Sequence, residues 1–190
     1  GIGEPFDNYE NLMRFLHNVN DHRGLEIGAR HITVSTCGIV PKIKEFADEN
    51  LQVNLAISLH APNDEIRNKI MPINRKYPLA EIVEAIRYYM SKSNRRITIE
   101  YILLRNLNDQ KSHAIELANL LKDLNVYVNL IPYNDVFEAP FKKSLPNVIK
   151  EFQQTLIDNN INTILREELG GDIEAACGQL RSQEIKGETN

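Results

Sequence analysis

The chain has 190 residues, a formal net charge of −4 and an ordinary globular composition, which fits one domain with a sizeable core. The acidic balance lacks the strongly basic footprint of many nucleic-acid-binding proteins, although a local basic patch would not show in the total. No apolar run is long enough for a membrane span, no signal peptide is recognisable, and two distant cysteines form no disulfide framework or CxxC site, so we expect a cytoplasmic protein.

Helical and strand-like segments alternate along the chain. It opens on a glycine-rich turn, Gly1–Pro5, with no element before it, so we expect a piece of a longer protein. Residues at helical spacing predict helices at 8–19, 41–49, 79–90, 111–124 and 148–158, with a short helix from residue 65. Asn108 and Asp109 are the expected caps of the helix at 111–124. Apolar and β-branched runs predict strands at 31–36, 53–59, 96–104, 126–131 and 161–166.

This alternation predicts βαβ units and a parallel sheet with helices outside it. An open doubly wound sheet and a barrel are both compatible with the pattern, and in both the functional site lies beyond the carboxyl ends of the strands. The polar residues expected there are Ser35, Thr36, Ser58, His60, Glu100, Asn129, Asn134 and, in the loop after the last strand, Cys177. Their convergence favours a site for a polar small molecule.

Each of these residues also has a purely structural interpretation. Ser35 could cap the following helix, His60 could be a satisfied structural group, and Asn134 could be a turn residue. Glu100 lies in an apolar strand, where a carboxylate needs a polar site or a cation. Cys177 could be a nucleophile, a metal ligand or an inert small hydrophobe.

Six segments together resemble the RlmN/Cfr family, which are radical S-adenosylmethionine (SAM) enzymes that methylate adenosine in RNA. The likeness extends to about residue 182, and the polar residues 183–190 are an expected disordered tail. The segments are Gly1–Pro5, Ile32–Gly38, Leu55–Asp64, Met71–Asn74, Asn129–Asn134 and Asp172–Leu180.

The resemblance implies a fold, a reaction and partners. The fold would be a partial (β/α)6 TIM-like radical SAM barrel that lacks its first two strands here, with residues 1–182 forming the C-terminal part of the methyltransferase core. The RlmN branch methylates C2 of adenosine in 23S rRNA and in some tRNAs, whereas the Cfr branch methylates C8 of the same rRNA base. The resemblance thus implies a 23S rRNA and tRNA (adenine-C2)-methyltransferase.

The resemblance also implies roles for single residues. Gly3 and Glu4 would receive the amino group of SAM. Further contacts to SAM would come from Ser35, Ser58, Leu59, His60 and Asn134. Cys177 would take a methyl group from one SAM as a thiolate, and a radical generated from a second SAM would then activate that methyl group for addition to the adenine ring.

One departure from the family pattern is decisive for this chain. The CxxxCxxC motif that holds the family's [4Fe-4S] cluster is absent, so no metal ligands are predicted here and the chain alone is expected to be inactive and to bind SAM weakly. The strand at 32–36 would also lack a neighbour, and we expect its edge to pair with a second copy or a displaced segment.

Two other classes of function stay open at this point. An ordinary α/β barrel enzyme could use Cys177 as nucleophile and His60 as base, which requires the two side chains within hydrogen-bond reach. A non-catalytic nucleotide- or protein-binding domain would need only the loops at the strand ends.

Overall fold

The computed structural model describes residues 3–135 and 140–166, and Cys177 and the predicted tail lie outside these ranges. The helices are α1 (Tyr9–Asn20), α2 (Val40–Asp48), α3 (Asp64–Ile70), α4 (Leu79–Lys92), α5 (Lys111–Leu120) and α6 (Pro146–Asp158). The strands are β1 (Thr33–Thr36), β2 (Asn54–Ser58), β3 (Ile97–Leu103), β4 (Val126–Pro132) and β5 (Asn162–Leu165). Three 3-10 turns are η1 (Pro5–Asn8), η2 (Ala29–His31) and η3 (Pro72–Arg75).

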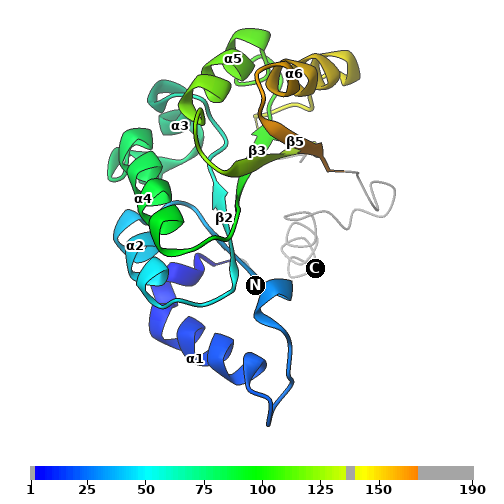
Figure 1. The fold of residues 1–190 in the computed structure, drawn as a ribbon. Coiled ribbons are helices and arrows are strands. Elements are labelled where there is room, and N and C mark those ends of the chain that lie inside the picture. Colours follow the sequence, from blue (N-terminus) through cyan, green and yellow to red (C-terminus); the bar gives the residue numbers. More distant parts are fainter. Residues whose placement is uncertain (1–2, 136–139, 167–190) are drawn as a thin grey trace, which may run out of the picture.

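The five strands form one parallel sheet in the order β1-β2-β3-β4-β5. Figure 1 shows this sheet curving, with helices covering its outer side. A doubly wound sheet reverses its strand order at a switch point, and this sheet does not reverse. The α/β prediction is therefore confirmed, and of its two alternatives the structure has the partial, unclosed barrel.

The two faces of the sheet differ because side chains alternate along each strand. Residues such as Leu55, Ile57, Ile97 and Ile99 are fully buried in the apolar core. The other face is the concave one, and its strand positions are more polar and more exposed, as the alternating burial of β1 and β4 shows. This concave polar face is the surface available to a ligand.

The predicted element boundaries were correct to within a few residues, with one wrong capping assignment. Asn108 and Asp109 do not cap α5. Gln110 is its N-cap and forms a reciprocal capping box with His113. Asn108 instead accepts the backbone N–H of Leu104 and thereby closes the loop after β3.

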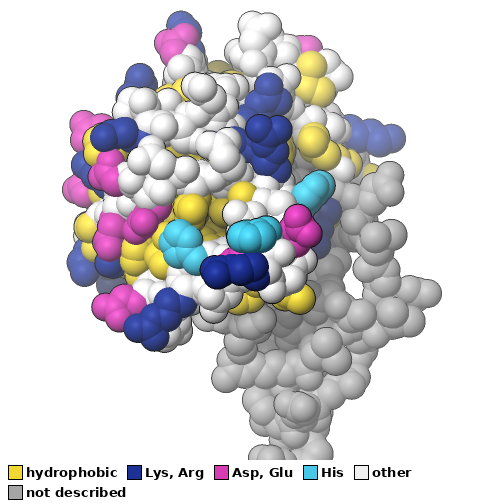
Figure 2. All heavy atoms as spheres, turned by 60° about the horizontal axis from the view of Figure 1, so that its bottom comes forward, with side chains coloured by type: hydrophobic (Ala, Val, Ile, Leu, Met, Phe, Trp, Pro, Cys, Tyr) yellow, Lys and Arg dark blue, Asp and Glu magenta, His cyan; other side chains and the backbone are white. Residues whose placement is uncertain are grey.

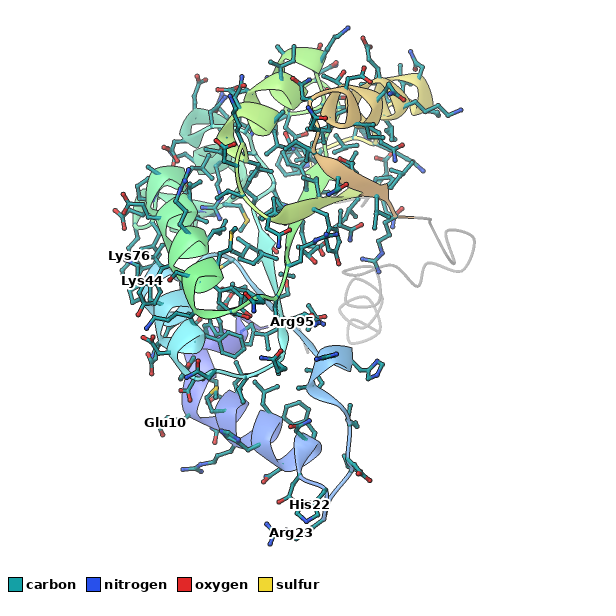
Figure 3. The ribbon with its side chains drawn as sticks, viewed as in Figure 1. Glu10, His22, Arg23, Lys44, Lys76 and Arg95 are labelled. Atoms are coloured by element: carbon teal, nitrogen blue, oxygen red, sulfur yellow. The ribbon has the colours of Figure 1, made fainter. Side chains whose placement is uncertain are left out.

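Charged side chains lie on the outer surface of the described residues. Figure 3 shows Glu10, Lys44 and Lys76 on the helical side, away from the concave face. Figure 2 shows histidine, basic and apolar side chains mixed on the underside of the molecule. Within residues 3–135 and 140–166, no helix is long and apolar enough to cross a membrane.

Strand β1 forms one edge of the described sheet, as predicted, because its only partner there is β2. Val34, on the side of the sheet that the helices cover, is buried, whereas Ser35 on the concave side is exposed. Pairing of this edge with a second copy stays a prediction.

Candidate functional site at the carboxyl ends of the strands

The predicted site begins where η1 meets the end of β1. The carboxylate of Glu4 accepts the backbone N–H of Cys37 at 2.7 Å through Oε2 and that of Phe6 at 3.1 Å through Oε1. Hydrogen bonds from these two backbone N–H groups fix the position of the carboxylate. Glu4 thus presents an oriented carboxylate beside β1, which is the chemistry needed to receive an ammonium group.

Cys37 is close to this carboxylate but is unsuited to nucleophilic chemistry. Burial, together with hydrogen bonding and charge repulsion from Glu4, raises the pKa of the Cys37 thiol to about 12, although the nearby Arg67 charge opposes this. The reactive form of cysteine is the thiolate. At neutral pH Cys37 is therefore a protonated thiol.

A buried arginine, Arg67 of α3, ties the ends of β1 and β2 together. Its Nη2 donates to the carbonyl oxygen of Cys37 at 2.7 Å and to that of Ser58 at 3.2 Å. Its Nε donates to the carbonyl oxygen of Leu59 at 3.0 Å. One rigid planar donor group therefore sets the distance between the two loops that carry the predicted SAM contacts.

The guanidinium of Arg67 is itself held in place by hydrogen bonds with Asn74 and, through it, Asp64. Its Nη1 donates to Oδ1 of Asn74 at 2.9 Å, and the amide of Asn74 donates to Asp64 at 2.9 Å. Arg67 and Asn74 are 0% and 2% exposed, so water does not replace these contacts. Burial lowers the pKa of Arg67 to about 10, which still leaves it charged at neutral pH.

Gly38 is required where this arginine meets the β1 loop. Its φ is +102°, a conformation that other residues rarely adopt. A Cβ here would lie 2.9 Å from Cδ1 of Ile82 and 3.4 Å from Nη2 of Arg67. The Cys-Gly dipeptide after β1 thus lets the backbone turn over the guanidinium.

His60 anchors the end of β2 to β3. Its backbone is left-handed at φ +60°, and its Nδ1 accepts the backbone N–H of Ile102 at 3.2 Å. The amide of Asn108 donates to the carbonyl oxygens of His60 at 2.8 Å and Ile102 at 2.7 Å. Burial, with the nearby Arg67 charge, lowers the pKa of His60 to about 4.

These contacts assign the tautomer of His60. The ring is neutral at pH 7, and because Nδ1 is an acceptor, the proton resides on Nε2. A histidine in this state can donate from Nε2 but has no free nitrogen to take a proton. The contacts argue against His60 as the general base of the alternative Cys177–His60 enzyme, and a hydrogen bond between its ring and the backbone of Glu100 partly opposes the lowering of its pKa.

We expect the stability of the chain to fall below pH 6.5 because of His60. Its pKa is about 4 in the fold and near 6.5 when unfolded, so the unfolded chain binds the extra proton first. The stabilisation present above pH 6.5 is up to about 3 kcal/mol and is lost as pH falls toward 4. Urea unfolding of wild type and His60→Asn at pH 7.5 and 5 checks this, since asparagine tolerates a left-handed backbone. A stability difference between the two proteins that does not shrink at pH 5 would contradict the assignment.

A second polar cluster lies on the concave face one strand further along. Ser58, Glu100 and Asn129 are paired across β2, β3 and β4 in register. The amide of Asn129 donates to Oε2 of Glu100 at 3.0 Å and to Oε1 at 3.3 Å. Burial raises the pKa of Glu100, partly offset by Asn129 and by the charge of Arg166. The prediction that Glu100 faces a polar environment is confirmed.

The other predicted residues are arranged around these contacts. Leu59 is fully buried and contributes its backbone, while Ser35 is exposed on the concave face one pleat before the end of β1. Gly3 immediately precedes Glu4. Asn134 follows the end of β4, half-buried and separated from β2 by β3. Cys177 is outside the described residues, so its distance from this end of the sheet stays untested.

Sequence reasoning missed the residues that hold the site together, namely Arg67, Asn74 and Asn108. No local pattern separates the buried Arg67 from Arg75, which is exposed. The one available signal was polar side chains close to the apolar Leu55–Ala61 segment, and that signal does not indicate which of them would turn inward.

One cavity of the structure lies away from this site. A cavity of about 530 Å³ lies at the opposite, amino-terminal end of the sheet, where Figure 3 shows Arg95. It is lined by Thr33, Asn54, Asn94, Arg95, Arg96, Thr98, Asn125 and Tyr127. Among the described residues there is also no group of three or more His, Cys, Asp or Glu side chains that could hold a metal ion. The sequence has two cysteines, fewer than the three thiolates of the CxxxCxxC motif.

Comparison with known proteins shows which proteins this chain resembles in sequence. Residues 1–118 match the model of the Radical SAM superfamily. The chain is 60% identical over 185 residues to a "Probable dual-specificity RNA methyltransferase RlmN" of Acholeplasma laidlawii, covering 97% of this chain and 55% of that protein. It is also 60% identical over 189 residues to the protein of the same name in Oceanobacillus iheyensis, covering 98% and 53%. The chain thus spans about half the length of the curated relatives it matches.

Solved structures agree with the sequence relatives. A radical SAM methyltransferase from Sphaerobacter thermophilus superposes with a TM-score of 0.91 at 47% identity, covering 94% of this chain and 52% of that one. A domain of pyruvate-formate lyase-activating enzyme from Bacteroides vulgatus shares the fold alone, at 17% identity and a TM-score of 0.66. The chain belongs to the radical SAM superfamily.

Proposed function

We propose that this chain is the C-terminal part of the catalytic core of an enzyme that methylates C2 of adenosine in 23S rRNA and tRNA. The observation that carries the proposal is the convergence of Glu4 with Ser58 and His60 at one end of the sheet, bridged by Arg67. This arrangement occurs in a chain 60% identical to proteins named for dual-specificity RNA methylation. The protein would act in the cytoplasm.

In this proposal the pocket binds SAM through groups matched to its polar parts. The fixed carboxylate of Glu4, beside Gly3, receives the ammonium group. Further contacts would come from Ser35, Asn134, the backbone of Leu59 and Nε2 of His60. Each contact pairs a donor with an acceptor, as a site for a polar cofactor requires.

Cys177 is proposed to accept the methyl group. Its thiolate attacks the methyl carbon of SAM, the carbon–sulfonium bond breaks, and S-adenosylhomocysteine leaves with the bonding electron pair. The related radical chemistry of the superfamily uses a [4Fe-4S] cluster, which supplies an electron for cleaving SAM. No ligand set for it exists in this chain, so residues 1–182 would contribute the SAM pocket and the methyl-accepting thiol to a larger core.

We expect SAM affinity to depend on the rest of the enzyme. Calorimetry under anaerobic conditions should show stoichiometric SAM binding by the protein from the complete reading frame, and weak or no binding by the 190-residue chain. The physical reason is that a bound cluster would supply contacts to SAM, and the two cysteines of this chain are too few to hold one. Tight stoichiometric binding by the chain alone would contradict the predicted dependence, and absence of binding by the complete protein would contradict the proposed function.

A further inference from the structure

The concave face carries a carboxylate that the SAM contacts above do not use. Glu100 is half-buried in the middle of β3, in the same cross-strand row as Ser58 and Asn129. Neighbouring strands lie about 4.8 Å apart, so Ser58 and Glu100 side chains on one face are adjacent. A carboxylate in such a half-buried position costs free energy unless hydrogen-bond donors surround it.

The described residues satisfy this carboxylate only in part. The amide of Asn129 donates to both oxygens of Glu100, at 3.0 and 3.3 Å. A carboxylate has about four acceptor positions, and the hydrogen bonds of the described residues to this side chain all come from Asn129. Asn129 therefore holds the carboxylate in place, the charge of Arg166 also acts on it, and it has acceptor capacity left toward the concave side.

We propose that Glu100 accepts hydrogen bonds from the ribose hydroxyl groups of SAM, with Ser58 beside it. This inference rests on the proposed function. Two neighbouring hydroxyls present two donors to the two carboxylate oxygens, and an acidic side chain commonly binds ribose in this way in nucleotide sites. The ammonium group of SAM is assigned to Glu4, and the ribose diol is the paired set of donors that remains. Glu100 thus selects a ribonucleoside and sets how deeply its sugar enters the barrel.

The test compares SAM with its 2′-deoxy analogue on the complete protein, using wild type and Glu100→Gln. Glutamine keeps the size of the side chain and one acceptor oxygen but removes the charge. We expect the Kd for SAM to rise about 10- to 100-fold, the effect of losing a hydrogen bond to a charged group. The Kd for the 2′-deoxy analogue should change several-fold less, because that ligand already lacks one of the donors.

Controls separate this role from a general loss of structure. Glu151→Gln removes an exposed carboxylate on α6, 3.7 Å from Lys111, and should leave both Kd values unchanged. Thermal unfolding of Glu100→Gln should match wild type, and Glu100→Asp, which retains the charge, should bind SAM with intermediate affinity. An equal loss of affinity for both ligands, or no loss for either, would overturn the proposal. Failure of wild type to bind SAM would overturn the proposed function itself.

Discussion

Replacing Arg67 by methionine is expected to lower the free energy of unfolding by about 3 kcal/mol. Methionine retains the volume of the side chain stem but leaves the carbonyl oxygens of Cys37, Ser58 and Leu59 without their buried donors. Arg67→Lys should recover part of the loss, because an ammonium group cannot reproduce a planar fork. Urea unfolding of the chain at pH 7 measures both effects.

The matched control for this experiment is Arg75→Met, eight positions away in η3. Arg75 is exposed, and its removal should change stability by no more than about 0.5 kcal/mol. In the complete protein, Arg67→Lys should also raise the Kd for SAM, since the two loops at the ends of β1 and β2 are no longer held in register. Equal stability of Arg67→Met and Arg75→Met would show that the Arg67 side chain does not hold these two loops together.

Replacing Cys177 by serine is expected to abolish RNA methylation by the complete protein, with a loss of at least about a thousandfold. Serine has nearly the same size, but its hydroxyl is not ionised at neutral pH and cannot accept a methyl group from SAM at a useful rate. Methyl transfer to RNA under anaerobic conditions is the measurement. SAM binding should survive the change, because the proposed contacts to SAM come from other residues.

Cys37→Ser is the control that the chain itself offers. The pKa of the Cys37 thiol is raised to about 12, so it is protonated and unreactive at pH 7. Serine retains the backbone N–H and carbonyl groups that contact Glu4 and Arg67, and its hydroxyl can replace the thiol as a hydrogen-bond donor to Glu4. Activity should stay within a few-fold of wild type. Loss of methylation in Cys37→Ser with activity preserved in Cys177→Ser would reverse the proposed roles of the two thiols.

The sequence predicted the architecture well because the signals for it are local. Each strand is a run of four to seven residues rich in apolar or β-branched side chains, and the helices carry buried apolar residues at helical spacing. Pro41 and Pro146 lie in the first turns of α2 and α6, where proline is suited to the backbone. The choice between barrel and doubly wound sheet was out of reach, because strand order depends on how whole units pack and not on any short pattern.

The residues proposed to contact SAM could be predicted from the sequence, whereas the residues that hold their loops in place could not. Glu4, Ser58 and His60 follow strand ends or a turn and carry a family motif, so their gathering could be expected. The hydrogen bonds of Arg67 and Asn108 form because these side chains turn inward. They turn inward to pair with backbone carbonyl groups that the tertiary fold would otherwise leave unpaired. The wrong assignment of Asn108 as a helix cap has the same origin, since its acceptor oxygen serves Leu104 instead.

The most direct test of the account is nucleoside analysis of RNA treated with the complete protein, purified anaerobically and supplied with SAM and a reductant. Mass spectrometry of digested 23S rRNA and tRNA is predicted to reveal 2-methyladenosine that is absent without SAM. RNA that stays unmodified while the protein binds and cleaves SAM would contradict the proposed function, and 8-methyladenosine as the product would contradict the assigned position.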